Sequence, residues 1–236
     1  MSSATITTSA RLMNSTPQTE EQAMVRKVAV SSFLGNFIEW FDYASYSYFA
    51  TTIALVFFPT DNHTVAMLQT FGVFALSFIL RPIGALFWGS YGDKKGRKAA
   101  LAHSIMFMSG ASFLIGCLPS YSVIGVGAPI LLLLLRMVQG FSASGEYAGA
   151  ATFLGEYAPT SKRGIYCSLI PASTAIGLLA GSTLATLMTA NMNSSAMVGW
   201  GWRVPFLLAG PLGLIVLYIR AKLADSPRLP VDERCA

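Results

Sequence analysis

A short, strongly basic segment lies between two long apolar stretches of this chain. From Gly89 to Lys98 the sequence is Gly-Ser-Tyr-Gly-Asp-Lys-Lys-Gly-Arg-Lys, with four cations and one carboxylate. Hydrophobic runs of about 20 residues flank it on both sides, long enough to cross a hydrocarbon core of about 30 Å. Such a segment cannot lie in the bilayer core, and cationic loops stay on the cytoplasmic face. We therefore predict a polytopic membrane protein with this loop in the cytoplasm.

The composition also favours a chain whose surroundings are largely lipid. Hydrophobic residues make up 53% of the chain and charged residues only 11%, whereas soluble domains carry about 25% charged residues. The mean hydropathy is +0.55. A water-soluble protein of 236 residues would need more polar surface than this, so the composition excludes that class.

The net charge of +5 does not indicate a nucleic-acid partner. Most of the cations group at one set of ends of the apolar stretches, which is the bias expected from membrane topology. No motif that reads a nucleic-acid groove accompanies them, so we predict no nucleic-acid partner. The grouped cations are Arg26, Lys27, Lys94, Lys95, Arg97, Lys98, Lys162, Arg163, Arg220 and Lys222.

Six apolar stretches are each long enough to cross a bilayer: residues 28–57, 65–90, 99–118, 122–147, 165–190 and 203–222. Backbone groups cannot stay unpaired in lipid, and barrel strands would be shorter and alternating, so these stretches are predicted to be helices. The links after the first, third and fifth stretches contain no Lys or Arg, whereas the other links and both flanks are basic. This alternation places both chain termini in the cytoplasm.

The predicted fold class is therefore an all-α membrane protein with six transmembrane helices. Residues 1–25 are predicted to be a flexible cytoplasmic tail, because they are rich in Ser and Thr and poor in large apolar residues. The six-helix bundle covers 26–224, and 225–236 form a short cytoplasmic tail that we interpret as a truncated end. The expected location is the inner plasma membrane of the cell, as a multi-pass protein.

Cysteine and histidine give no sign of a metal, disulfide or cofactor site. Cys117, Cys167 and Cys235 are an odd number of thiols without C-x-x-C spacing. His63 and His103 are isolated from one another in the sequence. Since no Ser/His or paired-His constellation is present either, we expect no catalytic residues, no metal and no cofactor.

Two carboxylates lie where charge is costly. Glu39 and Asp42 fall near the middle of the first stretch, and their i, i+3 spacing puts them on one face of a helix. A carboxylate at the bilayer centre costs about 3 kcal/mol on insertion scales, so two facing lipid would cost about 6 kcal/mol. They must therefore face a cavity or a cationic partner, or carry a proton.

Arginines in the second and fourth stretches are candidate partners. Arg81 lies within the second stretch and is followed by Pro82. Arg136 and Gln139 share a helical stripe on the fourth, with Glu146 further along the same helix. These groups could be static ion pairs that lock the bundle. Alternatively, they could line a polar cavity in which a moving arginine changes a carboxyl pKa and so loads and releases a proton.

Aromatic residues are dense around the two carboxylates. Trp40, Tyr43 and Tyr46 fall at the same depth of the first stretch. Aromatic faces bind quaternary-ammonium groups through cation–π contact, so these three are possible solute-lining residues. The alternative is that they pack inside the bundle or face lipid.

Several dispersed motifs resemble the major facilitator superfamily of transporters. The segment Gly89-x-x-x-Asp93-Lys94-x-Gly96-Arg97-Lys98 is similar to that superfamily's loop between helices 2 and 3, and Arg136-x-x-Gln139-Gly140 is similar to its helix 4 signature. Further segments resemble the metabolite:proton symporters: Gly35–Asp42, Arg81–Gly84, Gln139–Tyr147 and Gly201–Phe206. Within that group, the proline/betaine branch looks closest on the basis of Glu156–Pro159, Lys162–Gly164 and Pro211–Gly213.

The resemblance implies the amino-terminal half of a twelve-helix bundle that works by alternating access, with its substrate at mid-membrane between two halves. It implies proton-coupling or cavity roles for Glu39, Asp42, Arg81, Arg136, Gln139 and Glu146. It also implies a cytoplasmic gating latch formed by Gly89, Asp93, Lys94, Gly96, Arg97, Lys98 and Glu156. Because the family's pattern ends after the sixth helix here, we expect that a second six-helix half is needed.

The function implied by this resemblance is proton-coupled symport of a small polar metabolite across the cytoplasmic membrane. A proline- or betaine-type zwitterion and an organic acid both remain open as the solute, and the expected partners are solute, protons and the lipid bilayer. The alternative is a non-transporting half-bundle that binds a complementary half or a full-length transporter. An enzyme is not expected, and nothing resembles the selectivity filter of a channel.

Overall fold

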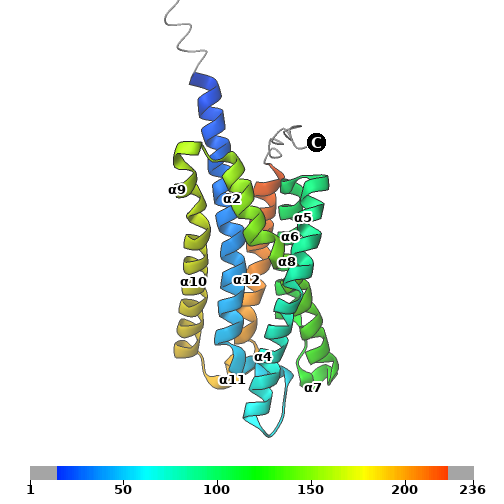
Figure 1. Ribbon diagram of the computed structural model, residues 1–236. Helices are drawn as coiled ribbons and strands as arrows, with labels where there is room; N and C mark the ends of the chain where they lie inside the picture. The colour runs from blue at the N-terminus through cyan, green and yellow to red at the C-terminus, as the bar shows by residue number, and fades with distance from the viewer. Residues whose placement is uncertain (1–14, 223–236) are drawn as a thin grey trace, which may run out of the picture.

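The computed structural model describes residues 15–222, and every regular element in that range is a helix (Figure 1). The elements are α2 (Ser15–Tyr48), α3 (Ala50–Phe57), α4 (His63–Ile79), α5 (Arg81–Lys95), α6 (Arg97–Cys117), α7 (Tyr121–Ile124), α8 (Gly127–Tyr157), η1 (Thr160–Lys162), α9 (Arg163–Cys167), α10 (Leu169–Asn191), α11 (Ser194–Gly199), η2 (Gly201–Arg203) and α12 (Val204–Ala221).

Five helical segments of the described chain are long and apolar enough to cross a membrane. They are His63–Lys95, Arg97–Cys117, Gly127–Tyr157, Thr160–Asn191 and Gly201–Ala221. The first predicted span is not among them, although α2 runs along the whole bundle (Figure 1). This helix carries Glu39 and Asp42, and polar residues of this kind lower its apolar character.

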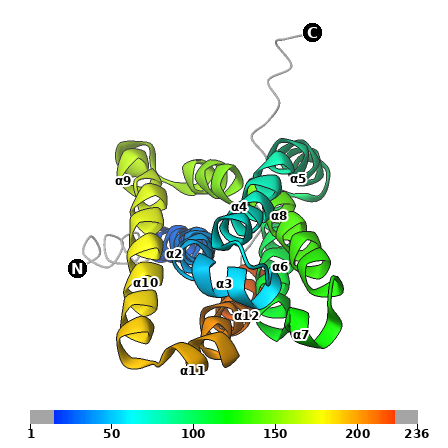
Figure 2. The same cartoon turned by 90° about the horizontal axis from the view of Figure 1, so that it is seen from below.

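The helices form one bundle with α2 near its middle. Seen along the bundle, α10 lies on one side of α2, and α12, α6 and α8 lie around the other (Figure 2). The main contacts join α2 to α10, α12 to α6, and α8 to α6, α5 and α4. Because the central helix is the one that bears the two carboxylates, its charges lie within reach of several other helices.

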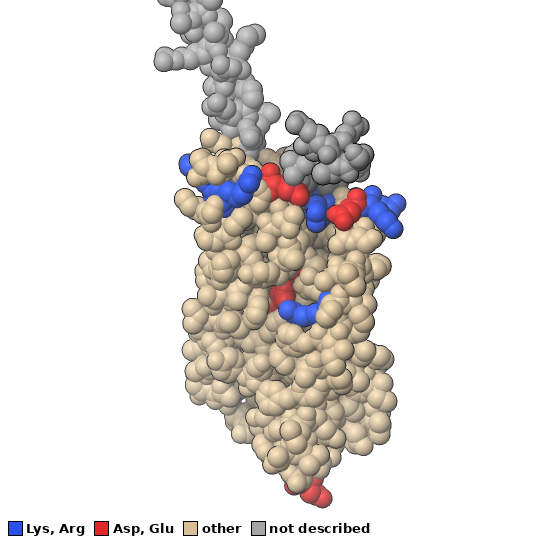
Figure 3. Space-filling model, viewed as in Figure 1, with Lys and Arg blue, Asp and Glu red and all other residues tan. Residues whose placement is uncertain are grey.

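The outer surface of the bundle is strongly apolar. Large side chains such as Leu86, Val123 and Leu179 are exposed. In Figure 3 the cations gather at the upper end of the visible face, while the long middle region is uncharged apart from one central group of acidic and basic atoms. An apolar surface of this extent is expected for a protein surrounded by lipid.

Prolines interrupt two of the predicted spans. Pro82 has no N–H for the carbonyl of Phe78, and the second span breaks at Leu80 into α4 and α5. Pro171 likewise cannot donate to the carbonyl of Cys167, and the fifth span breaks at Ser168 into α9 and α10. The first span also bends, at Phe49 between α2 and α3.

The segment predicted to be a loop between the second and third spans is almost entirely helical, so the predicted length of this loop was wrong. The helix α5 continues through Asp93 to Lys95, and α6 begins at Arg97. Gly96 alone makes the turn, with φ of 98°, a conformation that glycine adopts without the clash a Cβ would cause. Gly96 donates from its N–H to the Gly92 carbonyl at 2.9 Å and accepts from the Ala100 N–H at 3.2 Å, so this one residue ends α5 and begins α6.

The predicted flexible tail at 1–25 is also too long at its inner end. The helix α2 begins at Ser15, so the second half of that tail continues the first span as helix. Residues 1–14 and 223–236 lie outside the described residues, and with them the predicted tail at 225–236 and Cys235. At the other helices, α8 extends to Tyr157 and a short α11 occupies part of the last predicted link.

The interface between α2 and α10 depends on small residues and one buried amide. A Cβ at Gly177 would lie 2.8 Å from the Phe37 carbonyl oxygen, so only glycine allows the two backbones this close. Nearby, the Asn36 amide donates hydrogen bonds of 3.0 Å to the Ile170 carbonyl and 2.8 Å to the Ser173 hydroxyl. This close contact fixes α10 against the central helix.

The lower end of the bundle is closed by an aromatic cluster. Trp202 is fully buried and stacks edge-to-face on Phe57, with ring centroids 5.3 Å apart. Beside it, Arg203 donates a 2.7 Å hydrogen bond to the Leu118 carbonyl just beyond the end of α6. These contacts hold α3 and the end of α6 against η2, which leads directly into α12.

We predict that Gly177→Val destabilises the bundle, because its side chain would meet backbone atoms of α2. Overpacking of this kind costs about 1–3 kcal/mol. The matched control is Gly110→Val, since nothing lies within 4 Å of a Cβ at Gly110. Thermal unfolding of the purified variants in detergent measures both, and equal unfolding temperatures for the two would contradict the packing described here.

Candidate functional site

Three acid–arginine pairs lie inside the described part of the bundle. They are Glu39–Arg81, Asp42–Arg136 and Glu146–Arg220. Each acid belongs to α2 or α8, and each arginine to α5, α8 or α12. The pairs differ in the exposure of their side chains, and this exposure decides whether a solute could reach them.

The Asp42–Arg136 pair is sealed. Arg136 Nη1 donates a 2.7 Å hydrogen bond to Asp42 Oδ2, and their side chains are 0% and 5% exposed. Gln139 donates from its amide to Asp42 Oδ1 at 3.2 Å and to the Ser112 hydroxyl. The pair therefore joins α2, α6 and α8 in a region closed to the surface, where opposite charges attract strongly.

An aromatic ring completes this sealed pair. The guanidinium carbon of Arg136 lies 3.8 Å from the ring centroid of Tyr46, and the Tyr46 hydroxyl donates to the Thr70 carbonyl at 2.9 Å. Tyr46 is itself fully buried. In this structure the ring thus packs against Arg136, which does not support its predicted place among solute-lining residues.

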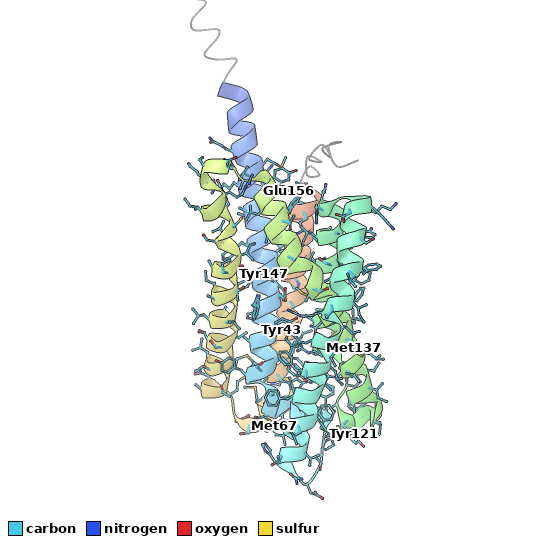
Figure 4. The ribbon with its side chains drawn as sticks, in the orientation of Figure 1. Tyr43, Met67, Tyr121, Met137, Tyr147 and Glu156 are labelled. Atoms are coloured by element: carbon cyan, nitrogen blue, oxygen red, sulfur yellow. The ribbon has the colours of Figure 1, made fainter. Side chains whose placement is uncertain are left out.

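The Glu39–Arg81 pair lies at the edge of the bundle. Arg81 Nη2 donates to Glu39 Oε1 and to the Tyr43 hydroxyl. The Arg81 side chain is 26% exposed, whereas that of Glu39 is 1% exposed. Tyr43 lies near mid-height on the face seen in Figure 4. This pair is the one that borders an open surface at the middle of the bundle.

Two neighbouring aromatic rings contact the Arg81 guanidinium. Its central carbon lies 5.0 Å from the ring centroid of Tyr43 and 4.8 Å from that of Phe78. Trp40, which is half-buried, packs edge-to-face on Tyr43 at 5.8 Å. Glu39 Oε2, Arg81 Nε and Trp40 Nε1 are buried polar atoms that have no hydrogen-bond partner among the described residues.

The Glu146–Arg220 pair was missed from the sequence. Arg220 was grouped with the cations at the helix ends, but it is 1% exposed. It donates to both Glu146 oxygens, to the Leu101 carbonyl and, at 3.3 Å, to the Ser31 carbonyl. The signal that could have found it is Glu146 itself, a carboxylate in an apolar helix for which no partner had been identified.

This third pair ties four helices together. Its groups come from α8 and α12, and the carbonyls that accept from Arg220 belong to α2 and α6. The Ser104 hydroxyl donates to Glu146 Oε2 at 3.2 Å. Gly35 leaves the space that these groups fill, because a Cβ there would lie 1.9 Å from Glu146 Oε1.

The residues predicted to form the cytoplasmic latch meet at the upper end of the bundle. Arg97 lies 3.4 Å from Asp93 and 3.8 Å from Glu156, which is labelled at that end in Figure 4. Lys98 Nζ donates to the Ala221 carbonyl at 3.0 Å. Gly96 forms the turn beside them, Lys94 is exposed, and Gly89 lies further back along α5. The structure thus brings α5, α6, α8 and α12 together here.

Within residues 15–222 no group of three His, Cys, Asp or Glu side chains could hold a metal ion. Cys117 and Cys167 are free thiols. The polar chemistry available inside the bundle is therefore that of carboxylates, guanidinium groups, amides and hydroxyls.

We predict that Arg220→Met lowers the free energy of unfolding by about 3–5 kcal/mol, because Glu146 would stay buried without its partner. The double variant Glu146→Leu/Arg220→Met removes both charges and should recover most of that loss. Thermal unfolding in detergent compares them, with the exposed Arg163→Met as control. If the double variant is no more stable than Arg220→Met, the loss of stability does not come from an unpaired Glu146, and the prediction is contradicted.

Comparison with known proteins relates this charged bundle to membrane transporters. Residues 27–233 match the family described as "Sugar (and other) transporter". The glycine betaine/proline/ectoine/pipecolic acid transporter OusA of Dickeya dadantii is 43% identical over 207 residues, which are 88% of this chain and 41% of that protein. The proline/betaine transporter of Salmonella typhimurium is 42% identical with the same coverage. The chain thus spans less than half the length of these relatives.

Solved structures share the fold at low sequence identity. The proton:xylose symporter XylE, bound to 6-bromo-6-deoxy-D-glucose, superposes with a TM-score of 0.78 at 17% identity, covering 88% of this chain and 46% of that one. A partially occluded inward-open form of XylE from E. coli gives 0.78 at 18% identity, covering 87% and 51%. The match to the family model covers most of the chain, so the chain belongs to the family described as "Sugar (and other) transporter".

Proposed function

We propose that this chain is one half of a proton-coupled symporter that carries a small zwitterion of the proline or betaine kind across the plasma membrane. The relatives that it matches at 42–43% identity are transporters of proline and betaine. The single observation that carries the coupling is the sealed Asp42–Arg136 pair inside an otherwise apolar bundle. Apolar residues of similar volume often pack as well as a buried ion pair, so packing alone does not account for this one. Unlike Glu146–Arg220, it lies one helical turn from the partly exposed Glu39–Arg81 pair.

The proposed topology has six spans, with α2 and α3 together forming the first. Both described chain ends lie at the upper end of the bundle in Figure 1, and the visible cations gather at that same end in Figure 3. Cationic segments remain on the cytoplasmic side, which favours that end as the cytoplasmic one. The Asp93–Arg97–Glu156 contacts would then act at the cytoplasmic mouth as the gating latch.

In the proposed mechanism Asp42 carries the proton. While ionised, it neutralises Arg136 and is held by Gln139, so α2 and α8 stay together. A proton on Asp42 removes that attraction and leaves the Arg136 charge facing only the Tyr46 ring and its other neighbours. The rearrangement that follows would bias the two helices toward the other access state, which links proton entry to solute movement.

A second six-helix half is part of this proposal. The chain covers 41% of the length of its relatives. Arg81, which contacts Tyr43 near mid-height of the bundle (Figure 4), is 26% exposed. A partly exposed guanidinium at that depth is costly against lipid, so this face fits an aqueous cavity between two halves. The same polypeptide or a separate one could supply the opposing half.

The test is uptake in proteoliposomes. The chain is co-produced with the remaining helices of a proline/betaine transporter, and accumulation of labelled proline and glycine betaine is followed with and without an inward proton gradient. We predict that Asp42→Asn reduces gradient-driven accumulation to the level seen without a gradient, because an amide cannot be protonated as the carboxylate is. Exchange of solute across the membrane should persist.

The exposed-cation variant Arg26→Gln serves as the control and should accumulate solute like the parent. Gradient-driven accumulation by Asp42→Asn equal to that of the parent would rule out Asp42 as the proton carrier. Absence of any uptake by the parent assembly would contradict the transport function itself.

A further inference from the structure

We infer that the guanidinium of Arg81 is a resident cation that occupies the place of the solute's cationic group while the site holds no solute. When a solute binds, the cationic end of the solute replaces the Arg81 guanidinium beside the aromatic rings and Glu39. The displaced guanidinium then binds the carboxylate of the solute. This inference rests on the proposed function and identifies which residues of this chain would receive each end of a zwitterion.

The surroundings of Arg81 are those of a cation-binding site. The guanidinium carbon lies beside both the Tyr43 and Phe78 rings, 5.0 and 4.8 Å from their centroids, and these centroids are themselves 5.6 Å apart. One of its nitrogens donates to the Glu39 carboxylate. Aromatic faces combined with a carboxylate are what an organic ammonium group needs for recognition. In this structure the Arg81 side chain of the protein itself therefore occupies such a site.

Unpartnered polar atoms around the same group match the two ends of a zwitterion. Glu39 Oε2 is an acceptor without a partner among the described residues, on a side chain that is 1% exposed. Arg81 Nε and Trp40 Nε1 are donors without a partner there. The charge of a solute ammonium would be stabilised beside the free carboxylate oxygen, by attraction alone when the ammonium is quaternary. A solute carboxylate would accept hydrogen bonds from the free donors. Buried polar atoms are normally paired. The two sealed pairs also have atoms without a partner, among them Arg136 Nε and Arg220 Nε, but of the three pairs only Glu39–Arg81 is partly exposed, so a ligand could reach its free atoms.

Arg81 is also placed where it can move. It is the first residue of α5, directly after the break at Leu80 and before Pro82. Its side chain is 26% exposed, whereas that of Arg136 is 0% exposed. A guanidinium at a helix break on an open face can leave its carboxylate without unpacking the core, which the sealed Arg136 cannot do.

Charge balance selects the class of solute. When a zwitterion enters, Glu39 keeps a cationic partner and Arg81 gains an anionic one, so all four charges are paired. An organic anion would bind Arg81 but leave Glu39 buried without its partner, and an organic cation would leave Arg81 unpaired. Both are penalised in a site of low dielectric. The geometry therefore favours net-neutral zwitterions over the organic acids that the sequence alone left open.

The test is direct binding to the chain in lipid nanodiscs, since all residues of the site belong to this chain. Three labelled probes are compared: glycine betaine as the zwitterion, choline as a quaternary ammonium without a carboxylate, and acetate as a carboxylate without a cation. We expect the parent chain to bind glycine betaine more tightly than choline or acetate. Glu39→Gln should weaken glycine betaine binding about tenfold or more.

The decisive variant is Arg81→Gln. It removes the resident cation and leaves Glu39 and the rings free, so choline binding should strengthen about tenfold while glycine betaine loses its carboxylate partner. Arg81→Lys keeps a cation and should not gain choline binding. The control Arg163→Gln changes an exposed arginine elsewhere and should match the parent with every probe.

Phe78→Leu provides a second route if Arg81→Gln does not fold. It removes one aromatic face and should weaken glycine betaine binding in a chain that keeps both charges. Choline binding that is the same in the parent and Arg81→Gln, or acetate binding as tight as that of glycine betaine, overturns the inference. Either result with intact proton-driven uptake leaves the proposed function standing. A choline gain in Arg81→Gln without any uptake of proline or glycine betaine supports the resident cation and contradicts the proposed transport.

Discussion

An ionised side chain inside an apolar bundle must meet an opposite charge, and this requirement organises the present structure. Removing one partner of such a pair costs about 3–5 kcal/mol, more than most single contacts contribute. Glu39, Asp42 and Glu146 each form an ion pair with an arginine from another helix. The central position of α2 and its contacts with α8 and α12 bring these groups together, whereas α10 is held against α2 by small residues and the Asn36 amide.

Exposure divides the pairs into different kinds. Asp42–Arg136 and Glu146–Arg220 are closed within the bundle, and the second of them binds carbonyls of two further helices. Glu39–Arg81 borders an open face at mid-height, where the Arg81 side chain is 26% exposed. In the proposed account the open pair receives the solute and the sealed Asp42 pair responds to the proton, so the α2 helix carries both events within one turn.

Much of this arrangement could be predicted because charge in an apolar run is conspicuous. The cost of Glu39 and Asp42 in lipid required partners, and Arg81 and Arg136 were the arginines inside other spans. Which acid meets which arginine depends on packing and is not encoded in helical spacing. Arg220 was not predicted to be buried, because hydropathy cannot distinguish an arginine that extends to the membrane–water interface from one that points into the bundle. The one-residue turn at Gly96 was hidden for a similar reason, since charged residues continue a helix as readily as they form a loop.

The most direct measurement compares how water reaches the two arginine positions. With Cys117, Cys167 and Cys235 changed to serine, Arg81→Cys and Arg136→Cys are each treated in membranes with a membrane-impermeant methanethiosulfonate that carries a trimethylammonium group. This reagent needs an ionised thiol and so reports on water. The account predicts rapid modification at position 81, slowed by choline, whose cationic group binds the site that Arg81 leaves, and none at position 136 in the resting protein. Equal reactivity at both positions, or none at either, would contradict it.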